Sequence, residues 1–161
     1  SRLPSQLGLD QLTVFNDFEA VGHAVAQVGA AHLVPVCGPD RPLPENGVIT
    51  VIGPGTGLGV GMVVRQDRDR YTVVSTEGGH VSFAPVDAQE DEILAHLRRH
   101  FPRVSAERVI SGPGLLAIYQ ALAAITYRPA PLTEDKALWE APPGPAPLLR
   151  LRPAVCRQGA V

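Results

Sequence analysis

The sequence predicts an α/β fold, because segments with the spacing of amphipathic helices lie on both sides of a segment with the spacing of strands. Apolar residues recur at helical spacing in residues 16–28, 87–101 and 113–125. Between the first two of these segments, residues 48–75 contain three short runs rich in valine and isoleucine. The 161 residues are enough for one hydrophobic core but few for two complete domains. We therefore expect helices that flank a single sheet.

Composition argues against several classes of protein. The 14 Lys and Arg residues and the 16 Asp and Glu residues give a formal net charge of −2, and no basic run is present, so nucleic acid is not an expected partner. No stretch reaches about 18 consecutive apolar residues and no signal pattern opens the sequence, which predicts a cytoplasmic protein without membrane contact. The spacing of the two cysteines, Cys37 and Cys156, predicts neither a metal site nor a disulfide framework.

The first expected elements are a strand at residues 12–15 and a helix that follows it directly. Asn16 is a favoured N-cap residue, and acidic residues suit the first turn after it. One apolar stripe of the helix should face the core, formed by Ala20, Val21, Ala24, Val25 and Val28. Four prolines within residues 35–47 then exclude a helix or a central strand, so we expect a linker and a lobe boundary there.

An antiparallel meander is expected after the linker, with strands at residues 48–52, 60–64 and 71–75. Asp87 and Glu90 resemble a capping box for a helix that Pro102 should end after Phe101. Further helices are predicted at residues 113–125 and 134–141, the latter capped by Thr133. Seven of the 16 prolines lie between Pro129 and Pro153, and we expect residues 142–161 to be an irregular, proline-rich tail.

A glycine-rich loop is the first candidate for chemistry. It joins two predicted strands and contains Gly53, Gly55, Thr56, Gly57 and Gly59. Glycines leave backbone N–H groups free to converge on an anion, so the loop is a candidate phosphate cradle. It matches neither the Walker A pattern nor the dinucleotide-binding pattern. A glycine-rich hairpin turn without any ligand is the alternative interpretation.

Three further sites carry polar residues that suit a hydroxyl-rich ligand. Asp17 follows Asn16 at a strand-to-helix junction and could act as a general base, although local sequence alone favours simple helix capping for both residues. Glu77 and His80 share a tight turn after the third strand, where they could hold vicinal hydroxyls or simply be solvated. Glu107 follows Ser105, a pattern that is also typical of a helix start.

These features occur together in an order that resembles the bacterial ATP-dependent glucokinases of the hexokinase-like type. The resemblance rests on NDFEAV at residues 16–21, GPGTGLGV at 53–60, TEGGHVSFAP at 76–85 and VSAERVISGPGLL at 104–116. It covers about residues 3–139. It implies a two-lobed sugar kinase of the actin-like ATPase (ribonuclease H-like) superfamily, with a mixed sheet and flanking helices. On this basis residues 1–46 would belong to the small lobe and its linker, and residues 47–141 to the core of the large lobe.

The same resemblance implies roles for single residues. Asp17 would take the proton of the 6-hydroxyl of glucose, and the other sugar ligands would be Asn16, Glu77, His80 and Glu107. Gly53, Gly55, Thr56, Gly57 and Gly59 would contact phosphate of ATP, with Mg²⁺ bound through the nucleotide and no metal held by the protein itself. The expected partners are glucose and ATP, and a longer protein is expected to form a homodimer.

Two features depart from the family pattern. An Asp-x-Gly-Gly-Thr phosphate loop and a glycine-rich adenosine-binding segment are both missing, so we expect the chain to be an internal fragment of a glucokinase that is inactive alone. A non-catalytic sugar-binding regulator of the same fold is the alternative function, and Asp17 argues against it because a regulator needs no base. A chaperone-like or actin-like ATPase is a weaker alternative, since it has no use for Glu77, His80 and Glu107.

Overall fold

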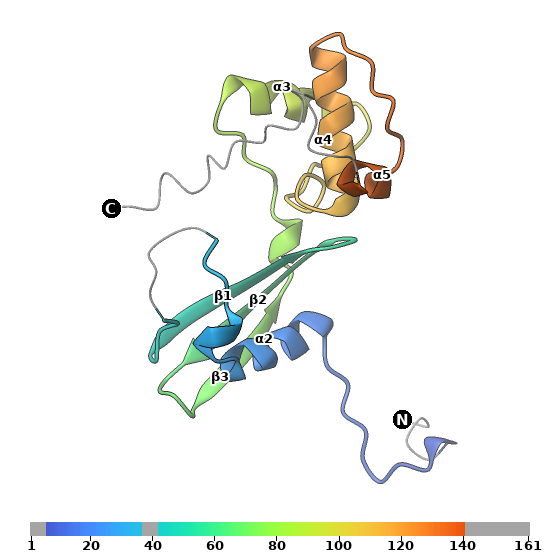
Figure 1. Cartoon of the computed structure of the whole chain (residues 1–161). Coiled ribbons are helices and arrows are strands. Elements are labelled where there is room, and N and C mark those ends of the chain that lie inside the picture. The colour runs from blue at the N-terminus through green and yellow to red at the C-terminus, as the bar shows by residue number, and fades with distance from the viewer. Residues whose placement is uncertain (1–5, 37–41, 141–161) are drawn as a thin grey trace.

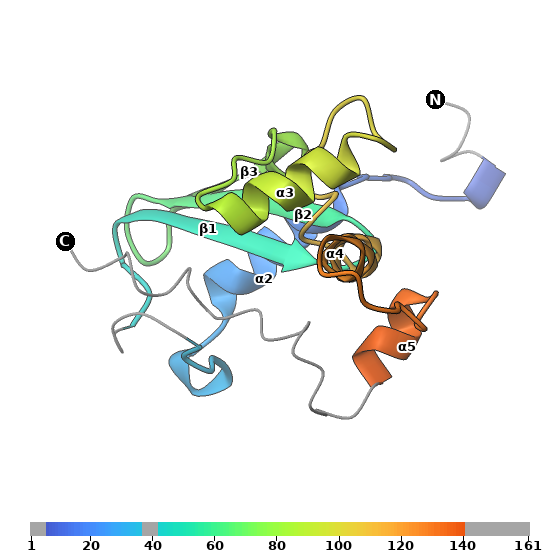
Figure 2. The same ribbon diagram turned by 90° about the horizontal axis from the view of Figure 1, so that it is seen from above.

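The computed structural model describes residues 6–36 and 42–140. Helix α2 covers one face of a three-stranded sheet, and a second group of helices, α3 to α5, lies beyond one end of the strands (Figure 1). The view from above again places α2 on one side of the strands (Figure 2). The predicted α/β class is therefore confirmed, with the helices divided between the sheet and a separate group.

The sheet is the antiparallel meander that the sequence predicts. Its strands follow the order β1-β2-β3, and they are β1 (Gly47–Pro54), β2 (Leu58–Arg65) and β3 (Tyr71–Thr76). In the register, Val51 lies opposite Gly61, and Val63 lies opposite Val73. The described strands form no parallel pair, so the mixed character of the sheet stays a prediction.

A charged turn joins β2 to β3. The Asp67 carboxylate accepts hydrogen bonds from the backbone N–H groups of Asp69 and Arg70 and from Nε of Arg70. The Arg70 side chain, followed by these backbone N–H groups, lowers the pKa of the Asp67 carboxyl. This turn has the Asx pattern that favours a reversal of the chain, which fixes the register of the two strands.

Helix α2 (Asp17–Gln27) begins where the sequence predicts, with Asn16 as its N-cap. The predicted apolar stripe is wrong in part, because Ala20, Val21 and Ala24 are exposed. The buried face instead consists of the small residues Gly22 and Ala26. A Cβ atom at Gly22 would lie 2.5 Å from Cγ1 of Val73, so the helix approaches the sheet too closely for a larger residue. A pattern of apolar residues does not reveal a face of this kind.

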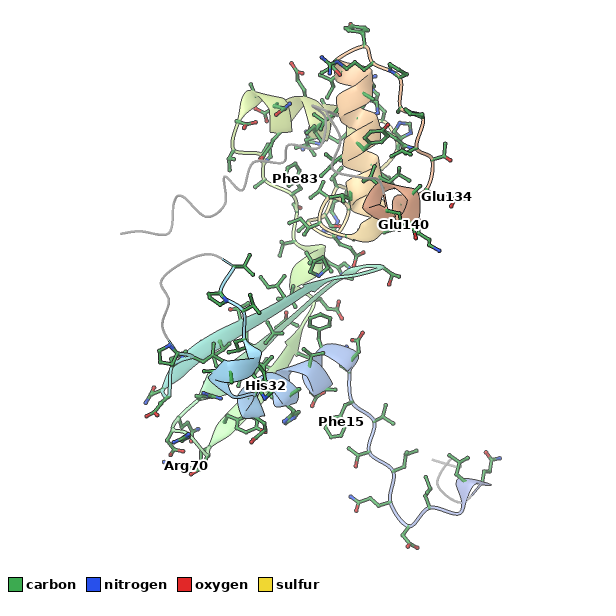
Figure 3. The ribbon with its side chains drawn as sticks, viewed as in Figure 1. Phe15, His32, Arg70, Phe83, Glu134 and Glu140 are labelled. Atoms are coloured by element: carbon green, nitrogen blue, oxygen red, sulfur yellow. The ribbon has the colours of Figure 1, made fainter. Side chains whose placement is uncertain are left out.

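The strand expected at residues 12–15 is absent from the structure. This segment is extended and runs away from the sheet, with Val14 83% and Phe15 54% exposed (Figures 1 and 3). The Phe15 ring makes an edge contact with the His23 ring, at a centroid distance of 6.0 Å. A strand needs a neighbour for its N–H and C=O groups, and none of the described residues pairs with this segment.

The second group of helices has its own apolar core. Helix α3 (Ala88–Leu97) and helix α4 (Gly112–Ile125) contribute Ile93, Leu94, Leu97, Ala121 and Leu122, and Phe83 packs against this cluster (Figure 3). The predicted capping box is present in part: Asp87 accepts from the N–H of Glu90, but the Glu90 carboxylate accepts from the N–H of Val86 and not from that of the N-cap residue Asp87.

Helix boundaries in this group differ from the expected ones. Helix α3 ends at Leu97 and not at Phe101, and the Phe101 ring lies beneath the guanidinium of Arg108, 4.4 Å from its centroid. The last helix, α5 (Asp135–Glu140), begins one residue later than expected.

The lobe divisions expected from the sequence are not decided by these contacts. Helix α2 shares a core with the sheet through Ala26, Ile49 and Val63, across the proposed boundary at residue 46. The assignment of residues 1–46 and 47–141 to two lobes stays a prediction, and the proline-rich tail at 142–161 lies outside the described residues.

Among the described helices, none is both long and apolar enough to cross a bilayer.

The end of α4 offers a test of backbone strain. Tyr127 has φ of 55° and is 97% exposed, while Arg128 N–H donates to Ala123 O at 2.8 Å. This is the left-handed capping position that favours glycine. We expect Tyr127→Gly to raise the free energy of unfolding by about 0.5–1 kcal/mol, because the greater conformational entropy of glycine in the unfolded chain offsets part of the relieved strain, measured by urea unfolding with circular dichroism. Tyr127→Ala, which keeps a Cβ, is the control, and equal stability of the two variants would contradict a strain at this position.

Candidate active site

One cavity of about 310 Å³ collects all the site residues that the sequence predicts. Four segments surround it: the start of α2, the hairpin between β1 and β2, the turn after β3, and the loop before α4. The predicted residues that line it are Asn16, Asp17, Gly53, Gly55, Thr56, Gly57, Gly59, Glu77, His80 and Glu107. Residues up to 91 positions apart in sequence (107 − 16) therefore meet at one place.

A histidine between two carboxylates forms one wall. Nδ1 of His80 lies 3.2 Å from Oε2 of Glu77, and Nε2 lies 3.8 Å from Oε1 of Glu107. The side chain of Glu77 is 81% exposed, whereas that of Glu107 is 31% exposed. This arrangement presents several acceptors and an imidazole within a short span, which suits a ligand with neighbouring hydroxyl groups.

Backbone hydrogen bonds hold the two halves of this wall together. The N–H of Glu107 donates to Gly79 O at 2.9 Å, and the N–H of Ala106 donates to Val81 O at 2.8 Å. The Arg103 guanidinium also donates to His80 O at 2.6 Å. The turn that carries Glu77 and His80 is thus fixed against the loop that carries Glu107.

Asn16 and Asp17 lie at the start of α2, where both contribute to the cap. Oδ1 of Asn16 accepts from the N–H groups of Phe18 and Glu19, and Oδ1 of Asp17 also accepts from Phe18 N–H, at 2.9 Å. Capping engages the one side-chain oxygen of Asn16, whose amide NH₂ can still donate, and one of the two carboxylate oxygens of Asp17. No hydrogen bond within the described part of the chain engages Oδ2 of Asp17, so this oxygen is available to a ligand.

Packing requires glycine at some positions of the hairpin and not at others. Gly53 and Gly59 lie opposite each other in the β1–β2 pair, and the Phe18 ring occupies the space where their side chains would project. A Cβ at Gly57 would lie 2.6 Å from Oε2 of Glu107. At Gly55 a Cβ would meet no atom within 4 Å, so packing does not explain this glycine.

The hairpin tip has two backbone donors that remain available. Gly55 N–H donates to Gly57 O at 2.8 Å, and Leu58 N–H donates to Oε2 of Glu107 at 3.1 Å. The N–H groups of Thr56 and Gly57 make no hydrogen bond within residues 6–36 and 42–140. If the loop binds an anion, these two groups and the Thr56 hydroxyl are the donors that it offers.

Four lining residues were not predicted from the sequence: Phe18, Leu58, Val60 and Thr76. The Thr76 hydroxyl donates to Val60 O and accepts from Gly78 N–H, which secures the turn that begins at Glu77. Phe18 could have been found from its position beside Asp17, but only the strand register shows that it covers two glycines. No feature of the sequence distinguishes Leu58.

A resident metal site is not evident among the described residues, since no three His, Cys, Asp or Glu side chains lie close enough to share an ion.

Comparison with protein families decides to which family the chain belongs. A family model described as "Glucokinase" matches residues 1–144. The chain belongs to the glucokinase family. The resemblance inferred from its sequence motifs is confirmed.

Individual glucokinases agree with this assignment. The chain is 54% identical over 138 residues to "Glucokinase" of Zymomonas mobilis, covering 86% of this chain and 42% of that protein. It is 46% identical over 121 residues to "Glucokinase" of Paramagnetospirillum magneticum, covering 74% of this chain and 37% of that protein. The crystal structure of glucokinase from an Antarctic psychrotroph matches with a TM-score of 0.68 and 36% identity, over 81% of this chain and 39% of that one. The chain thus spans about two fifths of the length of these glucokinases.

Proposed function

We propose that this cavity belongs to a kinase that transfers the γ-phosphoryl group of ATP to the 6-hydroxyl of glucose, giving glucose 6-phosphate and ADP. The observation that carries the proposal is the meeting of Asp17, the Glu77–His80–Glu107 wall and the glycine hairpin around one cavity. Membership of the glucokinase family supports the same reaction. We place the protein in the cytoplasm and propose a homodimer for a longer protein of this family.

Each side chain has a distinct role in this proposal. Asp17 accepts the proton of the 6-hydroxyl through its free Oδ2, while its Oδ1 remains in the helix cap. Asn16, Glu77, His80 and Glu107 hold the other hydroxyls of the sugar. A site that pairs several hydroxyls leaves an acceptor unsatisfied when a deoxy sugar binds and covers it, so it selects against such analogues.

The glycine hairpin holds phosphate in this proposal. Gly55 leaves space for close approach, and the N–H groups of Thr56 and Gly57 are free to donate. Phosphoryl transfer depends mainly on positioning and on stabilisation of charge, which such donors provide. Mg²⁺ would enter bound to the phosphates of ATP, and it would neutralise part of their charge.

A sugar-binding regulator of the same fold is the second candidate. One observation favours it: Oδ1 of Asp17 accepts from Phe18 N–H, so helix capping alone can account for this carboxylate. A regulator would keep the wall and would not depend on Asp17. The two candidates therefore differ in the effect of replacing that residue.

The 161-residue chain alone is expected to form no glucose 6-phosphate from glucose and ATP. It spans 42% of the Zymomonas mobilis relative, and its glycine hairpin supplies too few donors for the charge of the transition state. A chimera in which this chain replaces the 138 matching residues of that relative should be active in a coupled assay. A folded chimera that binds glucose without turnover would refute the proposed function, and turnover by the chain alone would show that one hairpin suffices.

A further inference from the structure

The carboxylate of Glu107 faces two parts of the cavity at once. Its Oε1 lies 3.8 Å from Nε2 of His80, on the proposed sugar side. Its Oε2 accepts from Leu58 N–H at 3.1 Å, on the side of the glycine hairpin. Gly57 is so close to Oε2 that a Cβ there would lie 2.6 Å away. Glu107 is therefore in contact with the hairpin as well as with the sugar wall.

The hairpin tip has few other contacts that fix its position. Gly112 N–H, at the start of α4, donates to Gly55 O at 2.8 Å. The buried side chain of Leu58 and its carbonyl, which lies against Gly79, hold the base of the tip. Because Glu107 is 31% exposed, its bond to Leu58 is partly shielded from water and is stronger than a bond at the open surface.

We propose that Glu107 is a positioning residue for the glycine hairpin, in addition to its proposed contact with sugar. By holding Leu58 N–H, it keeps Thr56 and Gly57 at the cavity, where their free N–H groups can bind phosphate. This role rests on the proposed function, which supplies the phosphate group that the hairpin would bind. It adds that one carboxylate fixes the Glu77–His80–Glu107 wall relative to the N–H groups that would donate hydrogen bonds to phosphate.

The charge of Glu107 makes this proposal testable, because electrostatic repulsion and positioning predict opposite changes in the affinity for a triphosphate when Glu107 is replaced. A carboxylate close to a phosphate repels it, so removing the charge should tighten the binding of a triphosphate if repulsion were its main effect. If Glu107 positions the hairpin, its removal should weaken triphosphate binding instead, because the N–H groups of Thr56 and Gly57 are no longer held at the cavity. Glu107→Gln removes the charge and keeps an oxygen that can accept from Leu58 N–H, whereas Glu107→Ala removes both.

The experiment measures, by calorimetry, the binding of a non-hydrolysable ATP analogue with Mg²⁺ to the chimera with the Zymomonas mobilis glucokinase. Glu107→Ala should weaken binding at least about fivefold, and Glu107→Gln should bind as tightly as the unchanged chimera or more tightly. The amide of Leu58 should exchange its hydrogen about tenfold faster in Glu107→Ala, and it should stay protected in Glu107→Gln. Glu90→Ala is the matched control, since that carboxylate also holds a backbone N–H, that of Val86, but lies outside the cavity.

Either of two results would overturn the proposal. One is tighter binding of the analogue by Glu107→Ala, and the other is an unchanged Leu58 exchange rate in that variant. A chimera that binds no analogue at all would refute the proposed phosphate site instead, and the Leu58 exchange rates would still decide whether Glu107 positions the hairpin. Circular dichroism of each variant verifies that the fold is kept.

Discussion

Asp17→Asn should lower kcat by at least about a hundredfold in the chimera with the Zymomonas mobilis glucokinase, and it should leave glucose affinity nearly unchanged. Asparagine keeps an oxygen that can accept from Phe18 N–H, so the helix cap is retained. It cannot take the proton of the sugar hydroxyl, which is the step assigned to the carboxylate. Steady-state kinetics with glucose and ATP, together with calorimetric binding of glucose, separate the two effects.

Glu19→Gln is the matched control for this prediction. Glu19 is also an acidic residue in the first turn of α2, but it does not line the cavity. Both substitutions remove one negative charge near the helix N-terminus, so both lose the same favourable interaction with the helix dipole. If Asp17→Asn keeps the turnover of Glu19→Gln, Asp17 is only a capping residue and the regulator becomes the better candidate.

The elements that the sequence predicts well are those determined by local interactions. Asn16 caps α2 and Asp87 caps α3 through bonds to residues within three positions, and the β2–β3 turn closes through Asp67. The strand expected at residues 12–15 depends on a neighbour that local sequence does not specify. Where tertiary contacts decide the structure, as for the close approach of α2 through Gly22, the apolar pattern gives a face that is wrong in part.

The site likewise combines features that the local sequence predicts with features that only tertiary contacts determine. Its residues were predicted from motifs in the order typical of glucokinases, and the structure places them around one cavity. The reasons for individual glycines could not be predicted, because Gly53 and Gly59 become neighbours only through strand pairing. The bond between Glu107 and Leu58 joins residues 49 positions apart, and no local pattern indicates it. Motifs identify which residues meet, whereas the fold determines what each one contacts.

Gly79→Ala should be the most destabilising single substitution in the turn that carries Glu77 and His80. Gly79 is buried, and a Cβ there would overlap the backbone carbonyl oxygen of Leu58. A flexible side chain could move aside, but the carbonyl belongs to β2 at the point where its pairing with β1 begins. Gly79 O also accepts from Glu107 N–H, so any shift of the turn strains the bond between the two halves of the wall.

We expect Gly79→Ala to lower the free energy of unfolding by about 2–3 kcal/mol, the cost typical of overpacking, and to weaken glucose binding because His80 and Glu107 separate. Gly55→Ala is the control, since a Cβ at Gly55 meets no atom within 4 Å, and its stability should change by less than about 0.5 kcal/mol. Urea unfolding of the 161-residue chain measures the first effect, and calorimetry with glucose measures the second. Equal stability of the two alanine variants would mean that the turn can withdraw from Leu58, and the wall would then be an adaptable surface without a fixed geometry for hydroxyl groups.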